Sequence, residues 1–262
     1  ANTLAALYAG SVNLDLYRAR ARNFDSSLEA SLFANNIPVQ VYDTLVQTVR
    51  SGLPALHEYY NMRREILGLE ELRLYDTRVP LIEQISSSYA YDEAVEIVVN
   101  ALRPLGENYL DIVREGLTGD WVDRYENKGK RSGAFSHGAY RAHPFILMNY
   151  REDDIRHVFT LAHEAGHAMH TYFVSSNNPF QHYDYTIFEA EVASTFNEQL
   201  VFEQLLKQEN DPRLRAYLIG KQIDDIIATL FRQTMFAEFE RESHRMAEEG
   251  TPLTLDSIRN LY

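Results

Sequence analysis

The pentad His163-Glu164-Ala165-Gly166-His167 is the feature that most constrains the fold of this 262-residue chain. On an α-helix, residues four positions apart lie on one face, about 40° apart around the axis. Two imidazoles placed in this way can bind one Zn²⁺ ion, while the glutamate between them is suited to take a proton from water. The pentad therefore predicts a helix that carries a metal site on one face.

The residues around the pentad predict a long helix. An apolar stripe at helical spacing comprises Ile155, Val158, Phe159, Ala162, Met169 and Phe173. Asp153 or Asp154 is suited to cap its start, and Asn177-Asn178-Pro179 is expected to end it. A second helix is expected from about Thr186 to Gln208, and a very long third one from Asp211 until Gly250.

The rest of the chain is expected to be mainly helical. Helices are predicted near Tyr8–Tyr17, after Ser26 or Ser27, after Pro38, after Pro54, and from Asp92 past Pro104 to Val113. Short runs at 72–75 and 145–150 favour strands, which indicates a small antiparallel sheet near residues 70–76 and 120–150. Thr254 begins a final helix that has no stop signal. We therefore expect a single helical domain over 1–262, as a fragment of a longer chain.

Composition narrows the class of partner and compartment. The formal net charge is -13, which disfavours nucleic acid and anionic membrane surfaces because both require basic patches. The absence of cysteine excludes disulfides and thiolate chemistry. No apolar run approaches the roughly 20 residues of a membrane span, and the segment from Ala1 to Leu4 does not read as a signal peptide. These features favour a cytoplasmic protein.

A zinc site normally needs a third protein ligand. The metzincin pattern would place glycine at 170 and histidine at 173. This chain has His170 and Phe173 there, so that pattern is excluded. A carboxylate on the following helix is the other common solution, and Glu189 and Glu191 are the candidates. They differ by about 200° around a helix, so only one is expected to face the metal, and periodicity alone does not choose between them.

Two pairs of segments resemble a known family. Residues 163–170 and 188–195 resemble oligoendopeptidase F, which belongs with the thimet oligopeptidase-like zinc metallopeptidases. Residues 133–140 and 143–150 are also similar to its sequences. The resemblance covers most of the chain and is strongest from 121 to 197. It implies a multi-helix, zincin-type catalytic domain.

The resemblance also implies roles for individual residues. The implied zinc ligands are His163, His167 and Glu191, with Glu164 as the general base. The implied substrate contacts are His137, Gly138 and Tyr140, although the segment that contains them also reads as a plain structural hairpin. Members of the family are longer, with an N-terminal lobe and a C-terminal segment that hydrogen-bonds the scissile carbonyl. The chain therefore resembles their central catalytic portion.

Two further residues lie close to the predicted ligands in sequence. His170 follows His167 by three positions and is a candidate for contact with the ligands, although a packed helix histidine is the favoured reading. Thr195 lies one turn after Glu191 and could reach its carboxylate, or could serve ordinary helix packing.

The sequence thus predicts a zinc-dependent endopeptidase that hydrolyses short oligopeptides by metal-activated water, with one Zn²⁺ per chain. One alternative is an inactive metal-binding fragment, or one part of a split peptidase that needs the missing N- and C-terminal segments as partners. A helical interaction domain with an incidental pentad is the other alternative.

Overall fold

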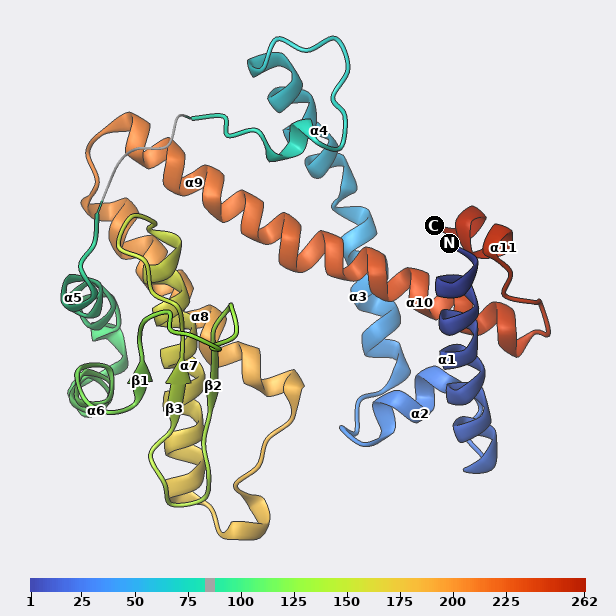
Figure 1. The fold of residues 1–262 in the computed structure, drawn as a ribbon, viewed down its shortest axis with the longest axis horizontal. Helices are drawn as coiled ribbons and strands as arrows, with labels where there is room; N and C mark the ends of the chain where they lie inside the picture. Colours follow the sequence, from blue (N-terminus) through green and yellow to red (C-terminus); the bar gives the residue numbers. More distant parts are fainter. Residues whose placement is uncertain (83–87) are drawn as a thin grey trace. The chain divides into compact units, whose positions relative to one another are not determined.

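The computed structural model describes residues 1–82 and 88–262. The described chain is mainly helical with one small sheet, which confirms the predicted fold class (Figure 1). It divides into two compact units, Ala1–Leu81 with Gly220–Tyr262 (unit 1) and Ile82–Ile219 (unit 2). The expectation of one catalytic domain within a longer chain stays a prediction.

Unit 1 is built from helices only. They are α1 (Asn2–Ala21), α2 (Ser27–Phe33), α3 (Val39–Ser51), α4 (Leu53–Ile66), the 3-10 turn Asp76–Arg78, the end of α9 (Pro212–Ile226), the π-helical segment Ile227–Phe231, α10 (Arg232–Glu248) and α11 (Leu255–Leu261). The long helix predicted up to Gly250 is therefore α9 and α10 joined by a π-helical segment.

Local sequence signals account for several helix boundaries in unit 1. The Ser26 side chain accepts the backbone N–H of Glu29 and caps α2, as predicted. Thr254 begins α11 through a capping box with Ser257, and Gly250 ends α10 with a φ of 85°. These short-range interactions fix where the helices begin and end.

The strand predicted at 72–75 is wrong. This segment is a turn that leads into the 3-10 helix Asp76–Arg78. The Asp76 carboxylate accepts the backbone N–H of Arg73 at 2.8 Å, a local hydrogen bond that competes with strand pairing. The buried Arg63 side chain of α4 donates to the carbonyls of Thr77 and Val79, which holds the turn against the helix.

Unit 2 packs its helices around an apolar core. They are α5 (Tyr91–Ala101), the 3-10 turn Arg103–Leu105, α6 (Glu107–Thr118), α7 (Arg156–Asn177), the 3-10 turn Phe180–His182, α8 (Ile187–Gln208) and the start of α9. Fully buried side chains at its centre include Leu102, Leu117, Leu161 and Met169. The single helix predicted from Asp92 to Val113 is wrong, because Gly106 has a φ of 90° and separates α5 from α6.

The predicted sheet near 120–150 is present and is mixed. Its strands β1 (Val122–Asp123), β2 (Phe135–His137) and β3 (Phe145–Leu147) lie in the order β1-β3-β2. β2 pairs with β3 antiparallel, whereas β1 pairs with β3 parallel, so a purely antiparallel sheet is wrong. The reason is topological: β2 joins β3 through one short loop, whereas the chain reverses twice between β1 and β3.

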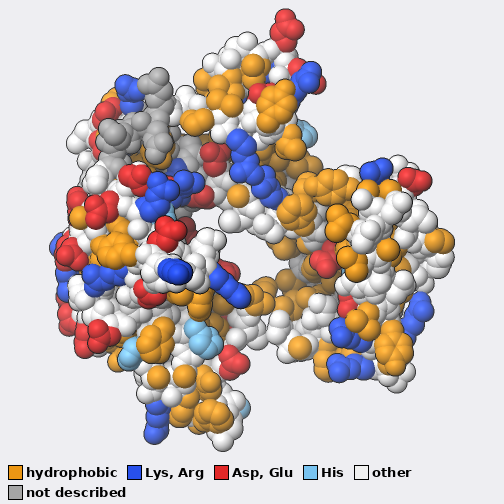
Figure 2. Space-filling view, in the orientation of Figure 1, with side chains coloured by type: hydrophobic (Ala, Val, Ile, Leu, Met, Phe, Trp, Pro, Cys, Tyr) orange, Lys and Arg blue, Asp and Glu red, His pale blue; other side chains and the backbone are white. Residues whose placement is uncertain are grey.

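No helix in the described part of the chain is long and apolar enough to cross a bilayer. Large hydrophobic side chains are nevertheless exposed among charged ones on the visible surface (Figure 2). On α8, Phe188, Val192 and Phe196 are each more than half exposed. They repeat every four residues, so they form one apolar stripe along the helix.

Candidate metal centre

Helices α7 and α8 lie in close backbone contact at Gly166, inside the pentad. A Cβ atom there would lie 2.6 Å from both the Ala193 carbonyl oxygen and the Ser194 Cα atom. Only glycine leaves room for this backbone-to-backbone contact. The contact places the first turns of α8 beside the two histidines of α7.

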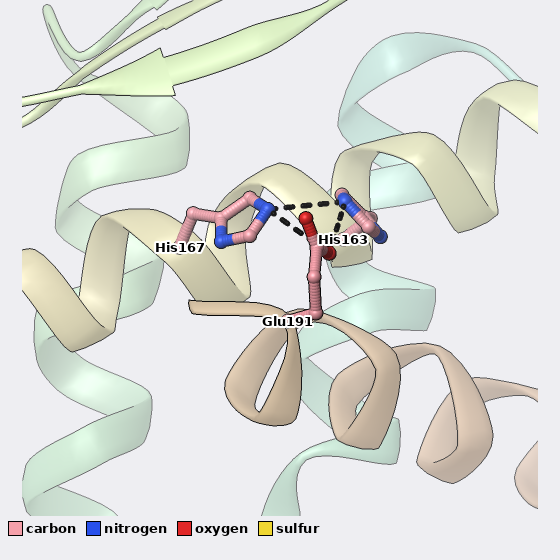
Figure 3. A group of neighbouring side chains, drawn as sticks. All are labelled: His163, His167 and Glu191. Carbon is pink, nitrogen blue, oxygen red and sulfur yellow. Dashed lines mark hydrogen bonds and ion pairs between the residues drawn. The ribbon is translucent and has the colours of Figure 1, made fainter. Parts of the chain in front are cut away.

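Three side chains converge at this point, two from α7 and one from α8 (Figure 3). The Nε2 atoms of His163 and His167 lie 3.1 Å apart. The Glu191 Oε2 atom lies 3.4 Å from the first and 3.5 Å from the second. Ligand atoms about 2.0–2.1 Å from a tetrahedral Zn²⁺ are separated by roughly 3.3 Å. The arrangement therefore fits one small cation held by two imidazoles and a carboxylate.

The structure separates the two glutamates between which periodicity could not choose. Glu189 accepts the backbone N–H of Thr186 at 3.1 Å and completes the capping box of α8. Its carboxylate is thereby used at the start of the helix. Glu191 is the one whose carboxylate faces the histidines.

Hydrogen bonds behind the three candidate ligands orient them. His163 Nδ1 lies 2.6 Å from Glu198 Oε1, so Nδ1 donates to the carboxylate and the Nε2 lone pair is left for a metal. The His167 ring forms a hydrogen bond with the backbone of Ala190. The Ser194 hydroxyl donates to Glu191 Oε2 at 2.9 Å. Such contacts fix ring orientation and tautomer, which a metal site requires.

Glu198 and Ser194 were missed by the sequence reasoning. Glu198 lies seven residues after Glu191, which is two helical turns, so it belongs to the same face of α8. That spacing could have indicated it once Glu191 was chosen. Ser194 gives no comparable signal, because serine at that position is also common in helix packing.

The structure distinguishes the alternatives left open for the two further residues near the ligands, and for His170 it agrees with the favoured reading. The Thr195 hydroxyl donates to the backbone carbonyl of Glu191 at 2.6 Å, so the predicted contact with the carboxylate is wrong. A hydroxyl one turn after a residue readily bonds its backbone carbonyl. The His170 ring stacks on Tyr185, with centroids 4.1 Å apart and planes 13° apart. His170 is therefore a packed helix histidine.

Glu164 lies between the two histidines and is 5% exposed. Burial raises the pKa of its carboxyl to about 7. Its Oε2 atom has no hydrogen-bond partner among the described residues. A buried carboxyl with a free oxygen and a pKa near neutrality has the properties of a general base at neutral pH.

The pKa values of the two histidines are shifted in opposite directions. Burial lowers the pKa of His167, and the neighbouring His163 lowers it further. Burial also acts to lower the pKa of His163, but the hydrogen bond and charge of Glu198 outweigh it and raise this pKa. A cation bound between the rings would therefore compete with a proton mainly at His163, which holds its proton more tightly than His167.

The three predicted substrate contacts lie where β2 ends. His137 is exposed at the end of β2, a strand that packs beside α7. A Cβ atom at Gly138 would lie 2.5 Å from the Thr171 methyl group of α7. The Tyr140 ring packs against Phe180 and Tyr183. Their part in substrate binding stays a prediction.

The fold and the site together define a mainly helical protein in which the pentad of residues 163–167 lies on one helix and the Glu191 carboxylate comes from the next. The whole chain, residues 1–262, matches peptidase family M3, a family of metallopeptidases, and belongs to it.

Several relatives cover the entire chain. It is 47% identical over 262 residues to the oligoendopeptidase F homolog of Borreliella burgdorferi and covers 44% of that protein. It is 44% identical over 261 residues to oligopeptidase PepF of Bacillus subtilis and covers 39% of it. Among solved structures, oligoendopeptidase-F from Enterococcus faecium has a TM-score of 0.70 and 35% identity, with 99% of this chain and 40% of that chain covered. The chain thus spans less than half the length of each of these relatives.

Proposed function

We propose that this chain carries the zinc centre and general base of an endopeptidase that hydrolyses short oligopeptides. The observation that carries the proposal is the convergence of His163 Nε2, His167 Nε2 and Glu191 Oε2 within distances that suit one tetrahedral cation. Membership of peptidase family M3 supports the reaction class. Relatives of this chain that are oligopeptidases support oligopeptides as substrates.

Each residue then has a defined task. A bound Zn²⁺ would supply a Lewis acid that polarises the scissile carbonyl and acidifies a water. Glu164 takes the proton of the attacking water and passes it to the leaving amine, for which a pKa of about 7 is suited. Glu198 holds the His163 ring in the tautomer that leaves Nε2 unprotonated. The close contact at Gly166 keeps Glu191 in reach.

Metal content tests the ligand assignment. The purified chain is expected to bind about one Zn²⁺ after dialysis against trace zinc. Glu191→Ala should lose most of it, whereas Glu189→Ala should retain it because Glu189 serves the capping box. The two variants remove the same side chain two positions apart on one helix. Equal zinc content in both variants would show that Glu191 is not a zinc ligand.

Turnover tests the general base. Quenched fluorescent peptides blocked at both ends report internal cleavage. Glu164→Gln should keep the metal and lose turnover by about 10²-fold or more, because proton transfer is lost while the ligands remain. A Glu164→Gln protein with ordinary turnover would exclude this role.

A second candidate is a metal-binding part that needs the rest of a longer enzyme for turnover. It is favoured by one observation: the chain spans 44% of the Borreliella burgdorferi relative and 39% of the Bacillus subtilis one. Stoichiometric zinc without cleavage of any blocked peptide would support this candidate over the first. Zinc-dependent cleavage by the chain alone would reject it.

A further inference from the structure

Tyr185 joins the loop between α7 and α8 to helix α7. Its hydroxyl lies 2.7 Å from the Thr171 hydroxyl, and Thr171 is 8% exposed, so the hydrogen bond is shielded from water. Its ring stacks on the His170 ring, with centroids 4.1 Å apart and planes 13° apart. One side chain thus makes two different contacts with α7, which fix both its distance from the helix and its orientation.

Tyr185 directly precedes α8. Thr186 is the N-cap of that helix and forms a capping box with Glu189. The capping box fixes the backbone at the point where the loop becomes a helix. The position of Tyr185 on α7 therefore sets the place from which α8 starts.

The side chains at the start of α8 add little packing of their own. Ile187, Phe188 and Val192 are each more than half exposed, whereas Ala190 is 9% exposed. A buried methyl group contributes much less stabilisation than a buried aromatic ring. The contacts of Tyr185 are therefore a major part of what holds this end of α8 against α7.

The contacts between the two helices step down α7 as they step up α8. They join His170 and Thr171 to Tyr185, His167 to Ala190, Gly166 to Ala193 and Ser194, and Ala162 to Asn197. Glu191 lies inside this series, and its carboxylate reaches toward the two histidines of α7 (Figure 3). A helix held mainly at one point can pivot about it. Contacts at both Thr186 and Ser194, roughly 12 Å apart at 1.5 Å per residue, prevent such a pivot.

We propose that Tyr185 is a positioning residue for the candidate metal centre. Its contacts with Thr171 and His170 hold the first turns of α8 so that the Glu191 carboxylate stays within reach of an ion on the two histidines. Metal–ligand distances tolerate deviations of only about 0.2 Å, so a small pivot of α8 is enough to take this carboxylate out of coordination. The inference rests on the proposed function, because it assigns Tyr185 a part in the same metal site.

Zinc affinity tests the proposal. Tyr185→Ala is expected to raise the dissociation constant for Zn²⁺ by about 10–100-fold, the effect typical of residues that orient a metal ligand. Tyr183→Ala makes the same change two positions earlier in the same loop, where the ring contacts Tyr140 and Phe180, and it should leave the constant unaltered. An unaltered constant in Tyr185→Ala, or an equal rise in both variants, would overturn the proposal.

Milder variants separate the hydroxyl from the ring and keep the test valid if Tyr185→Ala does not fold. Tyr185→Phe retains the ring, and Thr171→Val removes the other hydroxyl of the pair. Each is expected to raise the dissociation constant about fivefold, and the double variant no further, because both changes remove one hydrogen bond. Effects that multiply in the double variant would show that the two hydroxyls do not act as a pair and would overturn this part of the proposal.

Bound Co²⁺ separates positioning from ordinary packing. The visible absorption of Co²⁺ depends on how many ligands surround it. At saturating Co²⁺, the spectrum of Tyr185→Ala should approach that of Glu191→Ala, because the ion would then be held by His163 and His167 without the carboxylate. A Tyr185→Ala protein that unfolds at lower urea but keeps the spectrum of the unaltered chain would show a packing role only, and would overturn the proposal.

Hydrogen exchange of the zinc-free chain distinguishes failure of this proposal from failure of the proposed function. In Tyr185→Ala, the backbone amides of residues 191–194 should exchange about tenfold faster, because the start of α8 is no longer held against α7. In Tyr183→Ala they should not. A chain that binds no zinc but shows this difference would contradict the metal centre and support the anchoring of α8 by Tyr185. A chain that binds one zinc and shows no difference in exchange or affinity would contradict only the role of Tyr185.

Discussion

The two compact units differ in what holds their helices together. Unit 2 contains one apolar cluster in which side chains such as Leu102, Leu117 and Leu161 are fully buried. The buried hydrophobic residues in the described part of unit 1 are Val12, Leu16, Ala19, Val46 and Val49. Unit 1 relies on polar contacts between its helices as well, among them Tyr8 with Ser243 and Arg241 with Asp43.

The apolar cluster of unit 2 supports the helix that carries the candidate metal centre. A buried carboxyl such as Glu164 costs free energy unless it is compensated by packing elsewhere. The apolar cluster of unit 2 includes Leu161, Ala162, Ala165 and Ala168 of α7, the helix that carries the pentad. Dense packing on one side of α7 holds the polar groups on its other side in a fixed geometry.

Removal of a core side chain should show the largest effect. Leu161→Ala is expected to lower the free energy of unfolding of unit 2 by about 2–5 kcal/mol, because it removes a fully buried side chain and leaves a cavity. Urea denaturation followed by hydrogen exchange of α7 amides measures it. A loss below about 1 kcal/mol would mean that the cluster does not hold α7 rigidly.

Loss of the hydrogen bond behind His163 should weaken metal binding. Glu198→Gln is expected to raise the dissociation constant for Zn²⁺ by about 10–100-fold, because the ring loses its charged partner. Competition with a chromophoric chelator measures it. Glu203→Gln, an exposed change further along α8, should leave the constant unaltered. An equal effect of both changes would show that Glu198 acts only through net charge.

The metal-free chain should become more stable on Glu164→Gln at high pH. The pKa of Glu164 is raised from 4.5 to about 7 in the folded chain, so the unfolded state ionises first as pH rises. Below about pH 4.5 both states are protonated and burial of the carboxyl carries no charge penalty. Between pH 4.5 and 7 the penalty develops, and above pH 7 it is complete.

The glutamine variant lacks this penalty. Its advantage in unfolding free energy should therefore grow between pH 5 and pH 8 and reach about 3 kcal/mol. Denaturation of zinc-free protein at the two pH values measures it. An advantage that is the same at both would show that Glu164 ionises with an ordinary pKa.

A polar contact in unit 1 should have the smallest effect. Tyr8→Phe removes the hydroxyl that lies 2.5 Å from the Ser243 hydroxyl and is expected to cost about 1 kcal/mol. Hydrogen exchange of α1 and α10 amides reports the change. A loss as large as that of Leu161→Ala would mean that a polar contact stabilises unit 1 as strongly as a core side chain stabilises unit 2.

Features encoded by neighbouring residues could be predicted from the sequence. The extents of α7 and α8 follow from their apolar spacing and flanking residues, and the Ser26 and Thr254 caps form as expected. Two secondary-structure predictions failed because a local interaction outweighs the sequence pattern. The strand predicted at 72–75 is replaced by a turn that the Asp76 hydrogen bond stabilises. The single helix predicted from Asp92 to Val113 is divided by the positive φ of Gly106.

Features that depend on the contact between α7 and α8 could not be predicted from spacing. The choice of Glu191 over Glu189 follows from the rotation of α8 about its axis, which the contact at Gly166 helps to fix. The hydrogen bonds of Glu198 and Ser194 follow from the same rotation. Periodicity gives the angle between two residues of one helix but not the direction in which either one points.

The position of a bound metal tests the central claim most directly. Crystals of the chain grown with Zn²⁺ and measured on both sides of the zinc absorption edge give the ion's place without reference to activity. We predict one anomalous peak about 2.0–2.2 Å from His163 Nε2, His167 Nε2 and a Glu191 carboxylate oxygen. A zinc peak bound elsewhere, or one from which the Glu191 carboxylate is absent, would contradict the account.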